Sequence, residues 1–193
     1  MKLRKLKYIC IFCIPLLVLN QKAKPQDIGV PVNVHYKLLL KIITFDRNLD
    51  MRSSDAIGIG IVFQSMYRTS LNVKNQLAEE IETSQIKELN QKPITYLFID
   101  ITGENLETAI VQNNINILYF APIRAVNIEE ISELCQKHKI LSFSSVPKYC
   151  EMGFAVSVEQ VGDKPQIVIN HTAAKNSGID FSSQLLRLAR LIQ

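Results

Sequence analysis

Apolar residues recur at helical spacing near the start of the chain. The positions three or four residues apart are Val34, Leu38, Ile42, Phe45 and Leu49. This spacing predicts one helix with an apolar face. Pro31 suits its first turn, and Leu39, Leu40 and Ile43 widen the face. We therefore expect a well-buried first helix.

Four short, nearly continuous apolar runs follow. They are residues 56–63 (AIGIGIVF), 94–101 (ITYLFIDI), 115–120 (INILYF) and 140–145 (ILSFSS). Runs of this kind are typical of strands covered on both faces, as in parallel sheets. The small residues of the first run, Gly58 and Gly60 among them, share one face and would let another element approach closely.

Helical segments separate these runs. We expect helices over residues 68–83 and 105–112, and a third after Asn127, where Glu130 three residues later makes a capping-box-like start. Strands that alternate with helices predict a single α/β domain with a doubly wound, largely parallel sheet flanked by helices.

The pattern changes after residue 153. Residues 154–159 and 166–170 alternate apolar with polar side chains, and the turn residues 162–165 lie between them. This predicts a C-terminal antiparallel hairpin at the sheet edge. A short helix over 172–176 should end at Gly178, and Ser182 should cap a terminal helix that continues to Ile192.

The first residues are typical of a secretory signal peptide. Lys2, Arg4, Lys5 and Lys7 precede the apolar run 8–19. That run is about a dozen residues, shorter than the roughly 20 that span a bilayer as a helix. We expect residues 1–23 to be a signal peptide cleaved near Ala23, and residues 24–193 to be one exported domain. The alternative is an uncleaved anchor.

The signal segment also accounts for the charge of the chain. The whole sequence has a formal charge of +4, and five of its positive side chains precede residue 24, so the remainder is near −1. A basic patch on the folded domain, the usual sign of nucleic-acid binding, is therefore not indicated.

Two of the four cysteines, Cys10 and Cys13, fall inside the apolar leader, where their C-x-x-C spacing is accidental. Cys135 and Cys150 remain. Two cysteines in an exported protein predict one disulfide, whose loop of about 16 residues corresponds to roughly 3 kcal/mol. The alternative is two buried thiols.

No catalytic constellation is evident. His35, His138 and His171 lack a second ligand at zinc-like spacing, and no G-x-S-x-G motif is present. We expect neither enzymatic activity nor a metal or cofactor. Asp100 and Ser145 stand near the ends of predicted strands, where α/β proteins tend to bind ligands, but a capping aspartate and a loop serine are the alternatives.

The tail, residues 153–192, resembles the C-terminal signature of the YfiR-like family of small exported bacterial proteins. The matching positions are Gly153, Ile167, Ile169, Asn170, Ala173, Ala174, Gly178, Ile179, Ser182, Ser183, Leu185, Leu186, Arg187, Leu188 and Ala189. The chain departs from the family where Met152 stands beside Gly153 in place of a second glycine. It also has no tryptophan.

This resemblance implies a non-enzymatic periplasmic repressor. Such proteins dock on the outer-facing sensor domain of a membrane diguanylate cyclase and hold down cyclic-di-GMP synthesis; they tend to form homodimers with stabilising disulfides. The partner here would be such a cyclase or a membrane histidine kinase. A small-ligand-binding α/β domain that feeds a transporter or sensor is the alternative.

Overall fold

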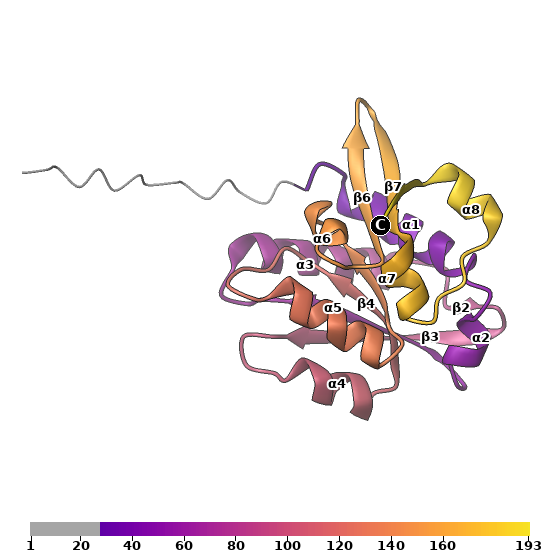
Figure 1. Cartoon of the computed structure of the whole chain (residues 1–193). Helices are drawn as coiled ribbons and strands as arrows, with labels where there is room; N and C mark the ends of the chain where they lie inside the picture. The colour runs from indigo at the N-terminus through magenta and orange to yellow at the C-terminus, as the bar shows by residue number, and fades with distance from the viewer. Residues whose placement is uncertain (1–27) are drawn as a thin grey trace, which may run out of the picture.

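The computed structural model describes residues 28–193 (Figure 1). Its strands are β1 (Ile57–Phe63), β2 (Glu88–Leu89), β3 (Lys92–Asp100), β4 (Ile115–Phe120), β5 (Leu141–Ser144), β6 (Val156–Val161), β7 (Lys164–Asn170) and β8 (Arg190–Ile192). Its helices are α1 (Val32–Ile43), α2 (Leu49–Arg52), α3 (Arg68–Thr83), α4 (Leu106–Gln112), α5 (Ile128–Lys137), α6 (Lys148–Glu151), α7 (His171–Asn176) and α8 (Ser183–Leu188). The predicted signal peptide lies outside the described residues.

The strands form one mixed sheet in the order β2-β3-β1-β4-β5-β6-β7-β8. The five central strands, from β3 to β6, are parallel, whereas β2 and β7 run antiparallel to their neighbours β3 and β6. This confirms the predicted doubly wound, largely parallel α/β domain. No helix within residues 28–193 is long and apolar enough to cross a bilayer.

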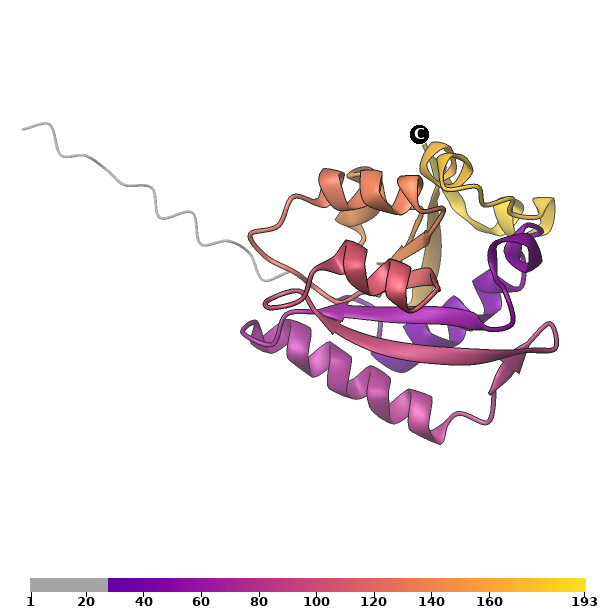
Figure 2. The same cartoon turned by 90° about the horizontal axis from the view of Figure 1, so that it is seen from below.

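Helices cover both faces of the sheet (Figure 2). One core cluster joins α1 and α3 to the side chains of β1 that point their way, such as Ile59 and Ile61. A second cluster joins α4 and α5 to the opposite face, where Val62 lies. The alternation along β1 therefore divides the core into two layers, as a strand buried on both faces requires.

The small face of β1 permits the close approach that the sequence predicted. A Cβ atom on Gly58 would lie 2.5 Å from the carbonyl oxygen of Asn114. A Cβ atom on Gly60 would lie 2.7 Å from the side chain of Leu118. Gly58 is therefore packed against the residue before β4, and Gly60 against β4 itself. A larger side chain at either position would push the two strands apart.

The single first helix that the apolar spacing predicted was wrong in its extent. Helix α1 ends at Ile43 and α2 begins at Leu49, with Asp46 between them in an isolated bridge to Phe181. The carboxylate of Asp46 accepts the N–H group of Asn48, so the chain turns here instead of continuing as a helix. Apolar spacing alone could not reveal this turn.

Two predictions at the sheet edges were also wrong. Strand β3 is not covered throughout: only Ile99 is fully buried, and β2 pairs with its first residues alone. At the other end the hairpin β6–β7 is not the edge, because residues after Leu188 leave the helix and pair with β7 as β8. The predicted terminal helix therefore ends early.

Gly153 provides a test of backbone strain. Its φ is +106°, and a Cβ atom there would lie 2.6 Å from Oγ of Ser132, whose hydroxyl donates to the Gly153 carbonyl at 2.6 Å. We expect Gly153→Ala to lower the free energy of unfolding by about 2 kcal/mol, from the left-handed backbone and the crowding together. Urea unfolding would measure this. Gly103→Ala, where nothing lies within 4 Å, is the control and should change little; equal losses would contradict the prediction.

Candidate functional site

The carboxyl ends of the parallel strands meet on one side of the molecule, at the left of Figure 1. After β1 the chain forms β3 on one side of β1. It then crosses over and forms β4 on the other side of β1. The sheet therefore has a switch point between β1 and β4, and α/β proteins place their ligands outside such points. A shallow hollow of about 260 Å³ lies here, lined by Gln64, Met66, Tyr67, Thr102 and Arg124.

An arginine stacked on an aromatic ring dominates this hollow. The guanidinium carbon of Arg124 lies 4.0 Å from the ring centroid of Tyr67, within cation–π range. Gln64, directly after β1, fixes the Arg124 backbone: its amide donates to the Arg124 carbonyl at 3.0 Å and accepts the Arg124 N–H at 2.8 Å. Ala125 follows with a φ of +52°. The loop after β4 is thus held in one conformation by the loop after β1.

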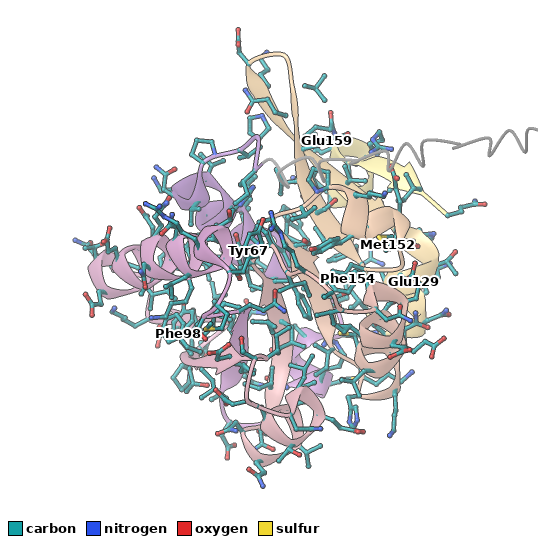
Figure 3. All side chains as sticks on the ribbon, turned by 90° about the vertical axis from the view of Figure 1, so that its left-hand side faces the viewer. Tyr67, Phe98, Glu129, Met152, Phe154 and Glu159 are labelled. Carbon is teal, nitrogen blue, oxygen red and sulfur yellow. The ribbon has the colours of Figure 1, made fainter. Side chains whose placement is uncertain are left out.

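Tyr67 lies near the middle of this side of the molecule (Figure 3). Its hydroxyl is buried without a hydrogen-bond partner, while Arg124 stacks on its ring. Met66, beside it, is 86% exposed. Among the ion pairs of residues 28–193, none involves Arg124. The guanidinium therefore remains available for a carboxylate or carbonyl of another molecule.

Asp100 stands at this edge as the sequence predicted, but its carboxylate is engaged by the protein. One oxygen accepts the N–H groups of Ser65 and Thr102, each at 3.1 Å. Desolvation raises the pKa of Asp100, and the hydrogen bonds from Ser65 and Thr102 outweigh this and hold it at about 2. Asp100 therefore stays ionised and orders the loops after β1 and β3. A role in binding a ligand stays a prediction.

Ser145 lies at the end of β5 but is only 1% exposed. Its hydroxyl and its N–H group both donate to the carbonyl of Phe120, each at 3.1 Å. The residue thus joins the ends of β4 and β5 beneath the surface. The structure gives it a place in the sheet, whereas the surface hollow is lined by Gln64, Tyr67 and Arg124 instead.

The residues of the hollow were not recognised from the sequence. Gln64 directly follows an apolar run, and Arg124 follows another by a few residues, so the rule that ligands bind at strand ends would have selected both. Their contact with each other depends on the pairing of β1 with β4, which the sequence pattern does not specify.

The predicted disulfide is absent from the structure, where Cys135 and Cys150 are free, buried thiols. Cys135 lies on the buried face of α5 and packs in the second core cluster. The Cys150 thiol instead faces the carbonyls of Val168 at 3.7 Å and Ala155 at 3.9 Å. Burial raises the pKa of Cys135 to about 12 and that of Cys150 to about 11. Packing therefore accounts for both residues without a bond.

Thiol labelling separates the two possibilities. We expect both cysteines to react with a maleimide in denaturant without reductant, and neither to react quickly in the folded protein, because both thiols are buried and protonated. Mass spectrometry of the labelled chain would count the adducts. An unlabelled denatured chain that reacts only after reduction would show that the disulfide forms.

The tail positions that carry the resemblance have structural roles. Asn170 caps α7 by accepting the N–H group of Ala173 at 2.9 Å, and Ser182 caps α8. Gly178 has a φ of +73°, as expected after a helix. Of the remaining positions, Ala173 and Leu185 are buried, Leu186 is half-buried, and Ser183, Arg187 and Leu188 are exposed.

The three histidines have different surroundings, and none of them contacts another. His35 is buried with its Nδ1 atom 3.2 Å from the Tyr119 hydroxyl. His138 contacts Glu107 at 2.7 Å, and His171 begins α7. No group of three or more potential metal ligands occurs within residues 28–193. We find no arrangement in this part of the chain that would hold a catalytic metal.

Comparison with protein families gives a match to the YfiR/HmsC-like family over residues 34–190. The chain belongs to this family. The match runs from α1 to the first residue of β8, so it covers nearly all of the sheet and confirms the resemblance of the tail. A comparison with curated protein sequences found no match.

Solved structures share the fold of this YfiR/HmsC-like chain at low identity. One is a conserved domain protein from Vibrio cholerae O1 biovar El Tor (TM-score 0.52, 16% identity, 84% of this chain and 60% of the other). An ABC domain in complex with L-Trp from Streptococcus pneumoniae has a TM-score of 0.56 at 17% identity, with coverage of 84% and 60%. A ligand-free, open substrate-binding protein with adhesive properties from Clostridium difficile has 0.51 at 16%, with 76% and 57%. The chain thus spans less than two thirds of these proteins, which show the fold alone.

Proposed function

We propose that this protein is a non-enzymatic periplasmic regulator that binds the outer-facing sensor domain of a membrane signalling protein. A diguanylate cyclase is the foremost candidate, with a histidine kinase as the alternative. The family match over residues 34–190 carries this proposal. The leader-like first residues support export, and the family resemblance also implies a homodimer, which light scattering would test.

The surface around Tyr67 supports docking of a protein. Met66 is exposed, and so is Arg124, whose guanidinium is held against the half-buried Tyr67 ring. Aromatic residues, methionine and arginine are enriched at protein–protein interfaces, and tyrosine and arginine are frequent hot spots. The volume of the hollow, about 260 Å³, is below the roughly 300–1,000 Å³ typical of small-molecule pockets. We propose this surface, from Gln64 to Tyr67 with Arg124, as the docking site.

A pull-down from membranes of its own cell tests the proposal. The tagged full chain, cross-linked in place, should recover a membrane sensor protein, and deletion of the gene should change cyclic-di-GMP. The double variant Met66→Ala, Arg124→Ala should reduce recovery about tenfold or more, the usual cost of losing interface hot spots.

Met51→Ala is the matched control, because Met51 is 78% exposed on α2, outside the docking site. It should recover the partner as the wild type does. The proposal fails if no membrane protein is recovered and cyclic-di-GMP does not change on deletion. Equal recovery by the double variant would show that docking uses another surface.

A second candidate function is small-ligand binding at the same edge. The observation that favours it is the likeness to an ABC domain in complex with L-Trp and to a substrate-binding protein. Arg124 would then bind a ligand carboxylate. Isothermal titration with free amino acids would test this candidate, and binding that Arg124→Ala abolishes would support it over docking. If titration with millimolar amino acids produces no heat of binding, this second candidate is excluded.

A further inference from the structure

Helices α4 and α5 lie side by side on the face of the sheet opposite α3 (Figure 2). A second concave surface lies between the start of α4 and α5. This groove has a volume of about 380 Å³, larger than the hollow at Tyr67. Its apolar lining comes from Ile101, Leu106, Val126, Ile131 and Leu134. Ile101, Leu106 and Leu134 are only partly buried against the second core cluster, and Val126 is 36% exposed.

Carboxylates surround the apolar lining. Glu104, Glu107 and Glu130 line the groove, and Glu129 and Glu133 lie exposed on the same helix as Glu130. Glu129 is labelled to one side of Tyr67 in the view onto the strand ends (Figure 3). The groove therefore combines an apolar floor with a negative rim.

Only one of the lining carboxylates contacts basic side chains. Glu107 pairs with Lys137 at 2.8 Å and with His138 at 2.7 Å. Glu104 accepts the N–H group of Asp100, and Glu130 accepts the side-chain amide of Asn127. Neither has a cationic partner among the ion pairs of residues 28–193. Two exposed carboxylates of the lining therefore have no cationic partner within residues 28–193.

We propose that this groove docks a basic amphipathic helix of a partner protein. Two neighbouring helices with an apolar floor match the helix-in-groove mode of recognition, in which an amphipathic helix places its apolar face between them. Lysine or arginine side chains at its edges would meet Glu104 and Glu130, which supplies charge complementarity. An acidic helix would be repelled. The proposal rests on the proposed function in that it describes part of the partner that the regulator binds.

Two labelled peptides of about 14 residues test the groove directly, one with Leu and Lys at helical spacing and one with Glu in place of each Lys. Fluorescence anisotropy with the full chain should show binding of the Lys peptide that weakens as salt increases, and none of the Glu peptide. Amide NMR shifts on binding should cluster in α4, α5 and the loops before them.

The double variant Glu104→Gln, Glu130→Gln should weaken binding about tenfold, because it removes both unbalanced charges while keeping the side-chain shape. The control, Glu79→Gln with Glu82→Gln, makes the same change in net charge on exposed positions of α3, across the sheet. It should leave affinity within about twofold. Equal losses in both variants, no binding of the Lys peptide, or shifts outside the groove would overturn the proposal.

The outcome for the groove is separable from that for the proposed function. If the groove variant recovers the membrane partner as well as the wild type does, the groove proposal fails while the regulatory function stands. If the wild type recovers no membrane protein, the regulatory function fails, and the groove is then judged by the peptide titration alone.

Discussion

Replacing Asp46 by alanine is expected to lower the free energy of unfolding by about 3–5 kcal/mol, the usual cost of breaking a buried ion pair from one side. The Asp46 side chain is fully buried, and its Oδ2 atom accepts a hydrogen bond from Arg52, whose own side chain is 9% exposed. Its Oδ1 atom accepts the N–H groups of Asn48 and Asp180, each at 3.0 Å. The variant would leave Arg52 as an unpaired buried charge.

Arg52 could not easily escape to solvent, because it also holds other parts of the fold. Its Nη1 atom donates to the carbonyls of Lys139 at 2.9 Å and Asn116 at 3.3 Å. The Asp46–Arg52 pair therefore joins four segments: the turn after α1, strand β4, the loop before β5 and the segment before α8. Since whole domains are stable by only about 5–15 kcal/mol, this one change would remove a large share.

Urea unfolding of the two variants Asp46→Ala and Asp180→Ala would measure the effect. Asp180 is the matched control: its side chain is 51% exposed and meets Arg47 at 3.3 Å. An exposed pair of this kind contributes about 0–1 kcal/mol. A loss for Asp46→Ala no larger than that for Asp180→Ala would show that Arg52 finds another partner.

The elements predicted best are those whose own residues determine them. Helix α3 and strand β4 have the predicted ends, because the first has an amphipathic pattern and the second a closed apolar run. The capping residue Asn127 also acts as predicted, accepting the N–H groups of Glu129 and Glu130. Local chemistry is sufficient in these three cases.

The elements missed depend on partners far along the chain. Residues after Leu188 have helical apolar spacing, yet they pair with β7 as β8, and Arg190 is held by Glu159 of β6 at 2.7 Å. The candidate site divides in the same way. Asp100 was found because it ends a recognisable strand, whereas the stacking of Arg124 on Tyr67 follows from the pairing of β1 with β4.

Stability is expected to fall by about 3 kcal/mol as the pH is lowered from 6.5 to 4, because of His35. The His35 ring is fully buried beside the stacked rings of Tyr119 and Phe143, and burial lowers its pKa from 6.5 to about 4. Above pH 6.5 the imidazole is neutral in both the folded and unfolded chain, so the stability is fully present. Between the two pKa values only the unfolded chain takes up the proton, which favours unfolding; below pH 4 both states are protonated and the loss is complete.

His35→Gln separates this effect from other titrating groups, because glutamine does not titrate but can still hydrogen-bond to the Tyr119 hydroxyl. The difference in unfolding free energy between wild type and His35→Gln should shift by about 3 kcal/mol in favour of the variant from pH 7 to pH 4. His171→Gln, at the half-buried start of α7, makes the same chemical change away from the buried ring and is the control for the substitution itself. If the unfolding free energies of wild type and His35→Gln change in parallel with pH, the folded protein takes up the His35 proton as readily as the unfolded chain does, and the prediction is wrong.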